Sequence, residues 1–91
     1  MGLGKERGKM ISESEKKNLL VGFKQTLRAV EEKRAEKVFL AGDCESKISA
    51  PIENAASSNG TQIFYVSTMK ELGEMCGIEV GSSCAVILKQ A

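Results

Sequence analysis

The stretch Val38-Phe39-Leu40-Ala41-Gly42-Asp43 decides the fold class of this chain. Four consecutive apolar residues follow a charged segment and precede a Gly-Asp pair, which is typical of a turn. A strand with one exposed face alternates apolar and polar residues, whereas a short continuous apolar run is typical of a strand covered on both faces. We therefore expect a central strand at residues 38–41, with other elements packed against both of its faces.

Upstream of this strand, the sequence predicts one short and one longer helix. Ser12 and Glu15 have the spacing of a capping box, and the short helix that they predict reaches about Asn18. Residues 19–21, Leu-Leu-Val, are either a brief strand or the end of that helix. Over residues 23–33 the apolar side chains recur at helical spacing, which predicts a second helix.

Downstream of the central strand, helical and strand patterns continue to alternate. Residues 49–58 predict a helix with Pro51 in its first turn, where proline is tolerated. Residues 63–66 are aromatic and β-branched and predict a strand. Thr68 and Glu71 have capping-box spacing, which predicts a further helix that ends at Gly77.

The last pattern, Cys-Ala-Val-Ile-Leu at residues 84–88, predicts another buried strand. Helices and buried strands thus alternate at short intervals, which is typical of a sheet that lies between two layers of helices. The sequence predicts the α/β class, with a three-layer α-β-α sandwich.

The length and composition indicate one compact domain. The chain has 91 residues, of which 42% are hydrophobic and 27% charged, close to the averages of globular proteins. We expect a flexible basic tail at residues 1–11 and a single domain at residues 12–91. No apolar run approaches the roughly 20 residues of a membrane helix, and the start of the chain lacks the hydrophobic stretch of a secretory signal. We therefore expect a cytoplasmic protein that has no membrane partner.

The residue types argue against an enzyme. The chain has no His, and its three Cys residues form no C-x-x-C pair, so we expect neither a metal nor a cofactor. The motifs of nucleophilic hydrolases, phosphate-binding loops and zinc hydrolases are absent from the sequence. Asp43 and Glu45 could form a carboxylate pair after the central strand, but a polar strand-to-helix turn is the simpler interpretation.

The segment from Gly22 to Ala29 carries the first candidate binding residues. Gly22 leaves the backbone amides of a helix start free, and Lys24 and Arg28, four residues apart, project from one face of that helix. Lys and Arg are common partners of the O6 and N7 atoms of guanine, and Gln25 can donate to and accept from a neighbouring base. The commoner role of such residues is a solvated face. With a net charge of only +1, an RNA-binding protein of this composition must gather its positive charge on one face.

The second candidate is the glycine-flanked segment from Cys76 to Ser83. Ile78 and Val80 are apolar, yet they lie in a predicted loop between a helix and the last strand. An apolar side chain held on a loop can pack against an unstacked RNA base, or it can tuck under the edge of the sheet. The sequence pattern leaves both interpretations open.

These two segments resemble the kink-turn RNA-binding family of small ribosomal proteins, which includes L7Ae and L30e. Three matches carry the resemblance over residues 19–88: Gly22 to Ala29, the pair of segments Met69-Lys70-Glu71-Leu72-Gly73 and Cys76-Gly77, and Ile78-Glu79-Val80 before a strand of small residues. The chain is most similar to the bacterial branch. The resemblance implies an α-β-α sandwich on a mixed four-stranded sheet, with residues 19–21 as its first strand.

The resemblance also implies a function and a set of site residues. Family members grip a kink in RNA whose tandem G·A pairs expose guanine edges, and an apolar loop packs against an extruded base. Carried over to this chain, the residues that face the G·A pairs are Gly22, Lys24, Gln25 and Arg28, those at the extruded base are Ile78, Glu79 and Val80, and Asp43 and Glu45 contact a base or ribose.

The chain departs from the archaeal pattern at three positions. Lys24 and Gln25 stand where Asn and Glu are common, and Met69 stands where many relatives have Lys. The implied partner is a kink-turn in ribosomal RNA or in another non-coding or leader RNA, with the ribosome as one particle that the protein could join. We expect a non-catalytic monomer. The alternative is a protein-interaction module or an accessory module of RNA-modifying enzymes, since similar domains occur there.

Overall fold

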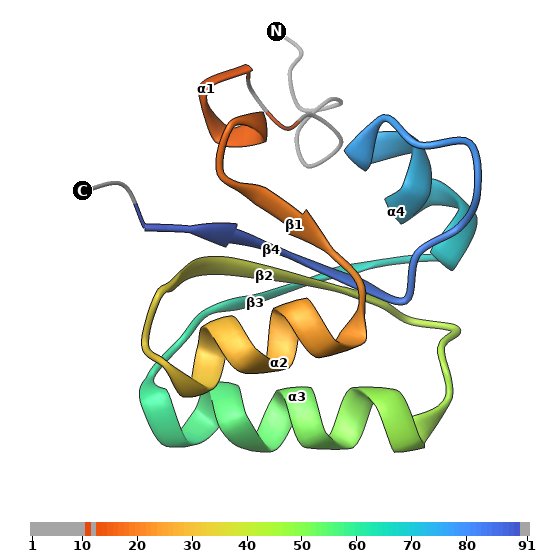
Figure 1. The fold of residues 1–91 in the computed structure, drawn as a ribbon. Coiled ribbons are helices and arrows are strands. Elements are labelled where there is room, and N and C mark those ends of the chain that lie inside the picture. The colour runs from red at the N-terminus through yellow and green to blue at the C-terminus, as the bar shows by residue number, and fades with distance from the viewer. Residues whose placement is uncertain (1–10, 12, 90–91) are drawn as a thin grey trace, which may run out of the picture.

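The computed structural model describes residue 11 and residues 13–89 of the chain. Helices and strands alternate along it, as Figure 1 shows. In chain order the elements are α1 (Glu13–Lys16), β1 (Leu19–Val21), α2 (Phe23–Glu31), β2 (Ala35–Ala41), α3 (Ser46–Asn59), β3 (Ile63–Val66), α4 (Met69–Cys76) and β4 (Cys84–Leu88). The predicted order is confirmed, and the segment that the pattern left open at residues 19–21 is a strand.

The four strands form one mixed sheet in the order β1-β4-β2-β3. β4 pairs antiparallel with both β1 and β2, whereas β2 and β3 are parallel. The strands that contain the continuous apolar runs, β2 and β4, therefore occupy the middle of the sheet, as expected for strands covered on both faces.

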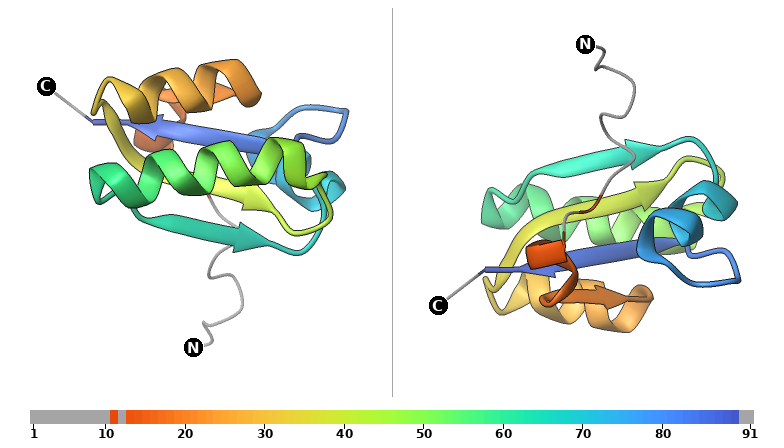
Figure 2. Two further views of the ribbon diagram at one scale, coloured as in Figure 1. Left: turned by 90° about the horizontal axis from the view of Figure 1, so that it is seen from below. Right: turned by 90° about the horizontal axis from the view of Figure 1, so that it is seen from above.

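Successive side chains of the two central strands enter two separate cores. One core lies between the sheet and helices α2 and α3, and its buried residues include Val30, Val38, Leu40, Ile52, Ala56, Cys84 and Val86. The other lies on the α4 side and includes Phe39, Ala41, Val66, Leu72, Met75, Ala85 and Ile87. Figure 2 shows the two layers of helices on opposite faces of the sheet. The predicted three-layer α-β-α sandwich is confirmed.

Helix α2 ends earlier than predicted. The expected helix reached residue 33, but Lys33 has a φ of 62° and leaves the right-handed helical conformation. The N–H of Lys33 donates to the Val30 carbonyl at 3.0 Å, and that of Arg34 donates to the Ala29 carbonyl at 2.9 Å. These two bonds form a Schellman motif, in which the left-handed position is usually a glycine. The apolar periodicity could not reveal a lysine in that conformation.

Helix α3 begins three residues before its predicted start, at Ser46. Pro51 therefore lies in the second turn and not in the first, and the prediction that rested on its position was wrong. The N–H groups of Ile48 and Ser49 donate to the Glu45 carbonyl, so backbone bonds close the first turn. Proline costs the helix one backbone bond there, a cost that the packing of Ile52 and Ala56 can offset.

Strand β2 begins at Ala35, before the apolar run that predicted it. Ala35 is buried and Glu36 is exposed, while Lys37 forms an ion pair of 2.6 Å with Glu15. Charged residues therefore continue the strand, one of them exposed and the other paired with α1.

Most of the predicted N-terminal tail, and Ser12 of the first capping box, lie outside the described residues. Ile11, which we assigned to the tail, is described and is buried against the α4-side core. The domain boundary at residue 12 stays a prediction. Among the helices in the described part of the chain, none has the length and apolar character needed to cross a membrane.

Candidate functional site

The segments that the sequence singled out meet at one end of the sheet. The N–H of Gly22, directly after β1, donates to the Cys84 carbonyl at 3.0 Å. The N–H of Ala41, at the end of β2, donates to the Ser83 carbonyl at 2.9 Å. The start of α2, the β2–α3 loop and the α4–β4 loop are therefore neighbours, on the right-hand side of Figure 1.

Gly22 shapes the start of α2. Its φ of 117° and ψ of 160° are strained for any residue with a side chain, so glycine is required there. Gly22 is the N-cap and provides no side chain that could accept from the first-turn amides. Those amides, at the positive end of the helix dipole, are open to an external acceptor such as a phosphate or a base oxygen.

Thr26 fixes which face of α2 reaches solvent. Thr26, Ala29 and Val30 are buried against the sheet. Lys24, Gln25 and Arg28 are exposed on the remaining face, so the three predicted donors are presented together. The Arg28 guanidinium lies 3.7 Å from Glu32, a pair whose two side chains are both well exposed and which therefore holds Arg28 only weakly.

The buried hydroxyl of Thr26 has no hydrogen-bond partner that meets normal geometry among the described residues. It faces the thiol of Cys84, which is a weak partner. Burial raises the pKa of that thiol, and the nearby Thr26 hydroxyl offsets part of the rise. This position is structural and gives the site no reactive group.

Asp43 and Glu45 have structural partners in the β2–α3 loop. One carboxylate oxygen of Asp43 accepts from the N–H of Met69 at 2.8 Å, which ties this loop to the start of α4. Glu45 lies 3.4 Å from Lys47 on an exposed surface. Both carboxylates lie at the same end of the sheet as Gly22, but each already has a partner within the chain, and their contact with a base or ribose stays a prediction.

The two apolar side chains of the loop after α4 differ: one packs against the core, and the other is exposed to solvent. Ile78 is half-buried and packs against the α4-side core. Val80 is 70% exposed, and Glu79 beside it is also exposed. Val80 is therefore the side chain that can pack against an unstacked base, while Ile78 anchors the loop.

Two glycines hold this loop against α4, and sequence reasoning did not assign them a role. A Cβ on Gly73 would overlap the Val80 carbonyl oxygen, and a Cβ on Gly81 would lie 3.2 Å from the Met69 carbonyl carbon and oxygen. The N–H of Ile78 donates to the Gly73 carbonyl, and that of Ser82 donates to the Met69 carbonyl, both at 3.0 Å. The sequence did hold one signal, because Gly73 lies inside a predicted helix. Glycine there lowers helix stability by about 1 kcal/mol relative to alanine, so its presence suggests that another segment packs closely against the helix.

The donor set does not suggest metal chemistry. In residue 11 and residues 13–89, no group of three His, Cys, Asp or Glu side chains is placed to bind a metal ion. All three cysteines are free, and burial raises the pKa of each thiol. The geometry therefore offers amides, long donors and one apolar side chain, which suit recognition of a ligand.

Comparison with known proteins shows which family the chain resembles. Residues 7–91 match the family described as Ribosomal protein L7Ae/L30e/S12e/Gadd45. An RNA-binding protein of Caldanaerobacter subterraneus subsp. tengcongensis is 46% identical over 66 residues, which cover 72% of this chain and 80% of that protein. An RNA-binding protein of Halalkalibacterium halodurans is 38% identical over 76 residues, covering 84% and 93%.

A solved structure shows the same fold. The Giardia lamblia 15.5kD RNA binding protein superposes with a TM-score of 0.75 at 24% identity, over 81% of this chain and 62% of that one. The names of the family and of these relatives describe ribosomal and RNA-binding proteins, not enzymes. The chain therefore belongs with non-catalytic proteins. The resemblance inferred from the sequence is confirmed: the chain belongs to the ribosomal protein L7Ae/L30e/S12e/Gadd45 family.

Proposed function

We propose that this chain is a non-catalytic RNA-binding protein that recognises a kink-turn through the start of α2 and the α4–β4 loop. The observation that carries the proposal is the convergence of these two segments, which are far apart in the sequence but joined through the Gly22–Cys84 backbone bond. The names of its relatives support RNA as the ligand class.

The start of α2 supplies the polar half of the surface. Lys24 and Arg28 can donate to the O6 and N7 atoms of guanines in tandem G·A pairs, and Gln25 can pair with an adjacent base. The open first-turn amides behind Gly22 add donors that need no side-chain ordering. Binding through this face does not depend on a large net charge, because Lys24 and Arg28 are exposed together at the start of α2.

The α4–β4 loop supplies the apolar half. A base leaving its stack loses its apolar contacts, and Val80 offers a replacement surface that is already positioned by the loop's docking on α4. Glu79, beside it, can accept from an exposed base amine. Lys70 on α4 is exposed and follows Met69, so it can supply the phosphate contact that Met69 cannot.

The test compares two RNAs and two sets of variants. A kink-turn RNA should bind more tightly than the same RNA with its G·A pairs replaced by Watson–Crick pairs. Lys24→Ala and Arg28→Ala should each weaken specific binding by about 1–3 kcal/mol. Lys89→Ala, which removes an exposed cation at the opposite end of the sheet, is the matched control and should change affinity little. Equal affinity for the two RNAs would contradict the proposal.

The proposed partners follow from the same chemistry. A kink-turn in ribosomal RNA or in another non-coding or leader RNA would fit the surface, and binding as a monomer in the cytoplasm is part of the proposal. The family name, which describes ribosomal proteins, supports a place in a ribonucleoprotein particle.

A further inference from the structure

The two edges of the sheet differ in how they are protected from pairing. At one edge, β1 has three half-buried residues and follows Lys16 and Lys17. At the other, β3 has the sequence Ile-Phe-Tyr-Val, with no charge or proline, and its register with β2 is regular. Proteins usually protect an edge strand with charged side chains, prolines or bulges. β3 has none of these and is the open edge.

The backbone of β3 offers hydrogen-bonding groups on its outer side. The carbonyl of Gln62 accepts from Val38, and that of Val66 accepts from Gly42, so these carbonyls point toward β2 and the residue after it. Inward-facing groups recur at every second residue of a strand, which turns the N–H and C=O groups of Ile63 and Tyr65 outward. Within the described residues, β3 pairs with β2 alone.

Exposed aromatic side chains lie on both faces of this edge. Phe64 is 37% exposed and contacts Phe39 on the α4 side, with ring centroids 5.7 Å apart. Tyr65, 62% exposed, lies on the opposite face of the strand, beside α3. Two of the three large apolar side chains exposed in the described residues are therefore adjacent on β3. A strand added here would place alternate side chains over each ring.

A carboxylate lies beside Tyr65 at this edge. The Tyr65 hydroxyl donates to the Glu53 carboxylate at 2.6 Å. The Glu53 carboxylate therefore favours a cationic segment beside Tyr65.

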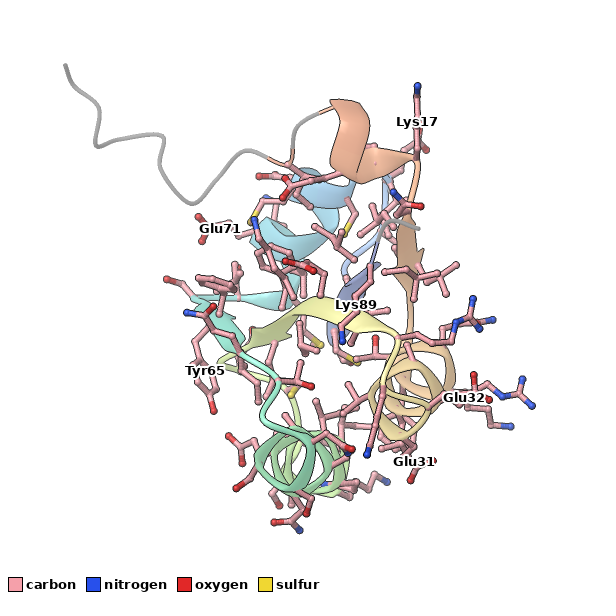
Figure 3. The ribbon with its side chains drawn as sticks, turned by 90° about the vertical axis from the view of Figure 1, so that its left-hand side faces the viewer. Lys17, Glu31, Glu32, Tyr65, Glu71 and Lys89 are labelled. Carbon is pink, nitrogen blue, oxygen red and sulfur yellow. The ribbon has the colours of Figure 1, made fainter. Side chains whose placement is uncertain are left out.

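We propose that β3 is a docking edge for an extended protein segment rich in Lys or Arg, which pairs with Ile63 and Tyr65 and adds a strand to the sheet. Backbone bonds would supply register, the aromatic rings would cover apolar or cationic side chains, and Glu53 would select positive charge. β3 and β1 lie at opposite edges of the sheet, so this surface goes beyond the proposed RNA site and leaves it free. Figure 3 shows Tyr65 on the side of the molecule away from Lys17.

The test uses the full chain and a capped peptide of sequence Lys-Val-Lys-Val-Lys-Val-Lys. Titration followed by amide NMR should shift the signals of β3 and of Glu53. Glu53→Gln keeps an acceptor for Tyr65 and should weaken binding about fivefold, as expected for one partly exposed charge pair. Glu31→Gln removes a carboxylate at the C-terminal end of α2 and is the control with no expected effect. The same peptide with Glu in place of Lys should not bind.

A peptide with N-methylated valines separates strand addition from simple charge attraction, because it keeps the side chains but loses backbone donors. Equal binding of this peptide would overturn the proposal, as would equal effects of Glu53→Gln and Glu31→Gln. Shifts at β3 caused by a single-stranded RNA, or by raising the concentration of the chain alone, would assign the edge to RNA or to a second copy and also overturn it. Kink-turn affinity is measured separately, so failure of either proposal leaves the other standing.

Discussion

The contact between Gly73 and the α4–β4 loop makes Gly73→Ala the most informative substitution. The new Cβ would overlap the Val80 carbonyl oxygen and lie 3.1 Å from both the Val80 carbonyl carbon and the Gly81 Cα. These are backbone atoms, so no side-chain rotation can relieve the overlap. Either α4 or the loop must move, and the loop, which is exposed, is the softer of the two.

Two opposing effects set the expected change in stability. Alanine in place of glycine inside a helix favours folding by about 1 kcal/mol. Overpacking of a close contact costs about 1–3 kcal/mol. The free energy of unfolding should therefore fall by at most about 2 kcal/mol. Affinity for RNA should also fall, because Val80 would be displaced from the position in which it can pack against an unstacked base.

The assay combines urea unfolding, kink-turn affinity and the amide signals of Ile78 and Ser82, whose N–H groups bond to α4. Gly60→Ala is the matched control: Gly60 has a φ of 67°, and no atom lies within 4 Å of the place that a Cβ would take, so it should lose about 1 kcal/mol of stability and no affinity. If Gly73→Ala shifts the loop signals but binds RNA as tightly as the parent protein, the loop does not position Val80 for binding. Unchanged loop signals would refute the steric argument itself.

Three further substitutions or reactions test the packing. Thr26→Val replaces a buried hydroxyl that lacks a good partner, and the free energy of unfolding in urea should rise by about 1 kcal/mol; a loss would show that the hydroxyl is well bonded. Lys33→Gly removes the strain of a side chain on a left-handed backbone, so the free energy of unfolding in urea should rise by about 1 kcal/mol, whereas Lys33→Ala should leave it unchanged. With iodoacetamide, half-buried Cys44 should react before buried Cys84, and mass spectrometry of peptides would reveal the reverse order. Because the fold raises thiol pKa values, stability present at neutral pH should decline as pH rises past the ordinary thiol pKa toward the raised values.

The sequence predicted the fold where local patterns and burial agree. β4 and β3 were placed correctly because apolar and β-branched residues fill them and turn residues bound them. The start of β2 was missed because Glu36 and Lys37 are charged: Glu36 is exposed, and Lys37 forms an ion pair with Glu15 of α1, a contact that the pattern could not reveal. The position of Pro51 was misjudged because tertiary packing outweighed a local preference.

The site was predicted less completely, since its geometry depends on contacts between distant segments. Lys24 and Arg28 could be paired from their spacing alone. The different roles of Ile78 and Val80 could not be predicted, because they depend on how the loop meets α4. The bond from Asp43 to Met69 also joins distant residues, and it gives Asp43 a structural role that the sequence pattern could not reveal.

The position of β4 has a consequence for the order in which the protein can assemble. β4 comes last in the sequence, yet it lies between β1 and β2 and holds Gly22 through Cys84. Before β4 is in place, β1 has no partner strand, and each of the two cores lacks residues that β4 supplies. A nascent chain that lacks β4 should stay sensitive to proteases. The early strand β1 can pair only after β4 has been made, and that pairing has the longest sequence separation in the sheet. Folding and the completion of the binding surface are then one event, so a partly made chain cannot compete for RNA.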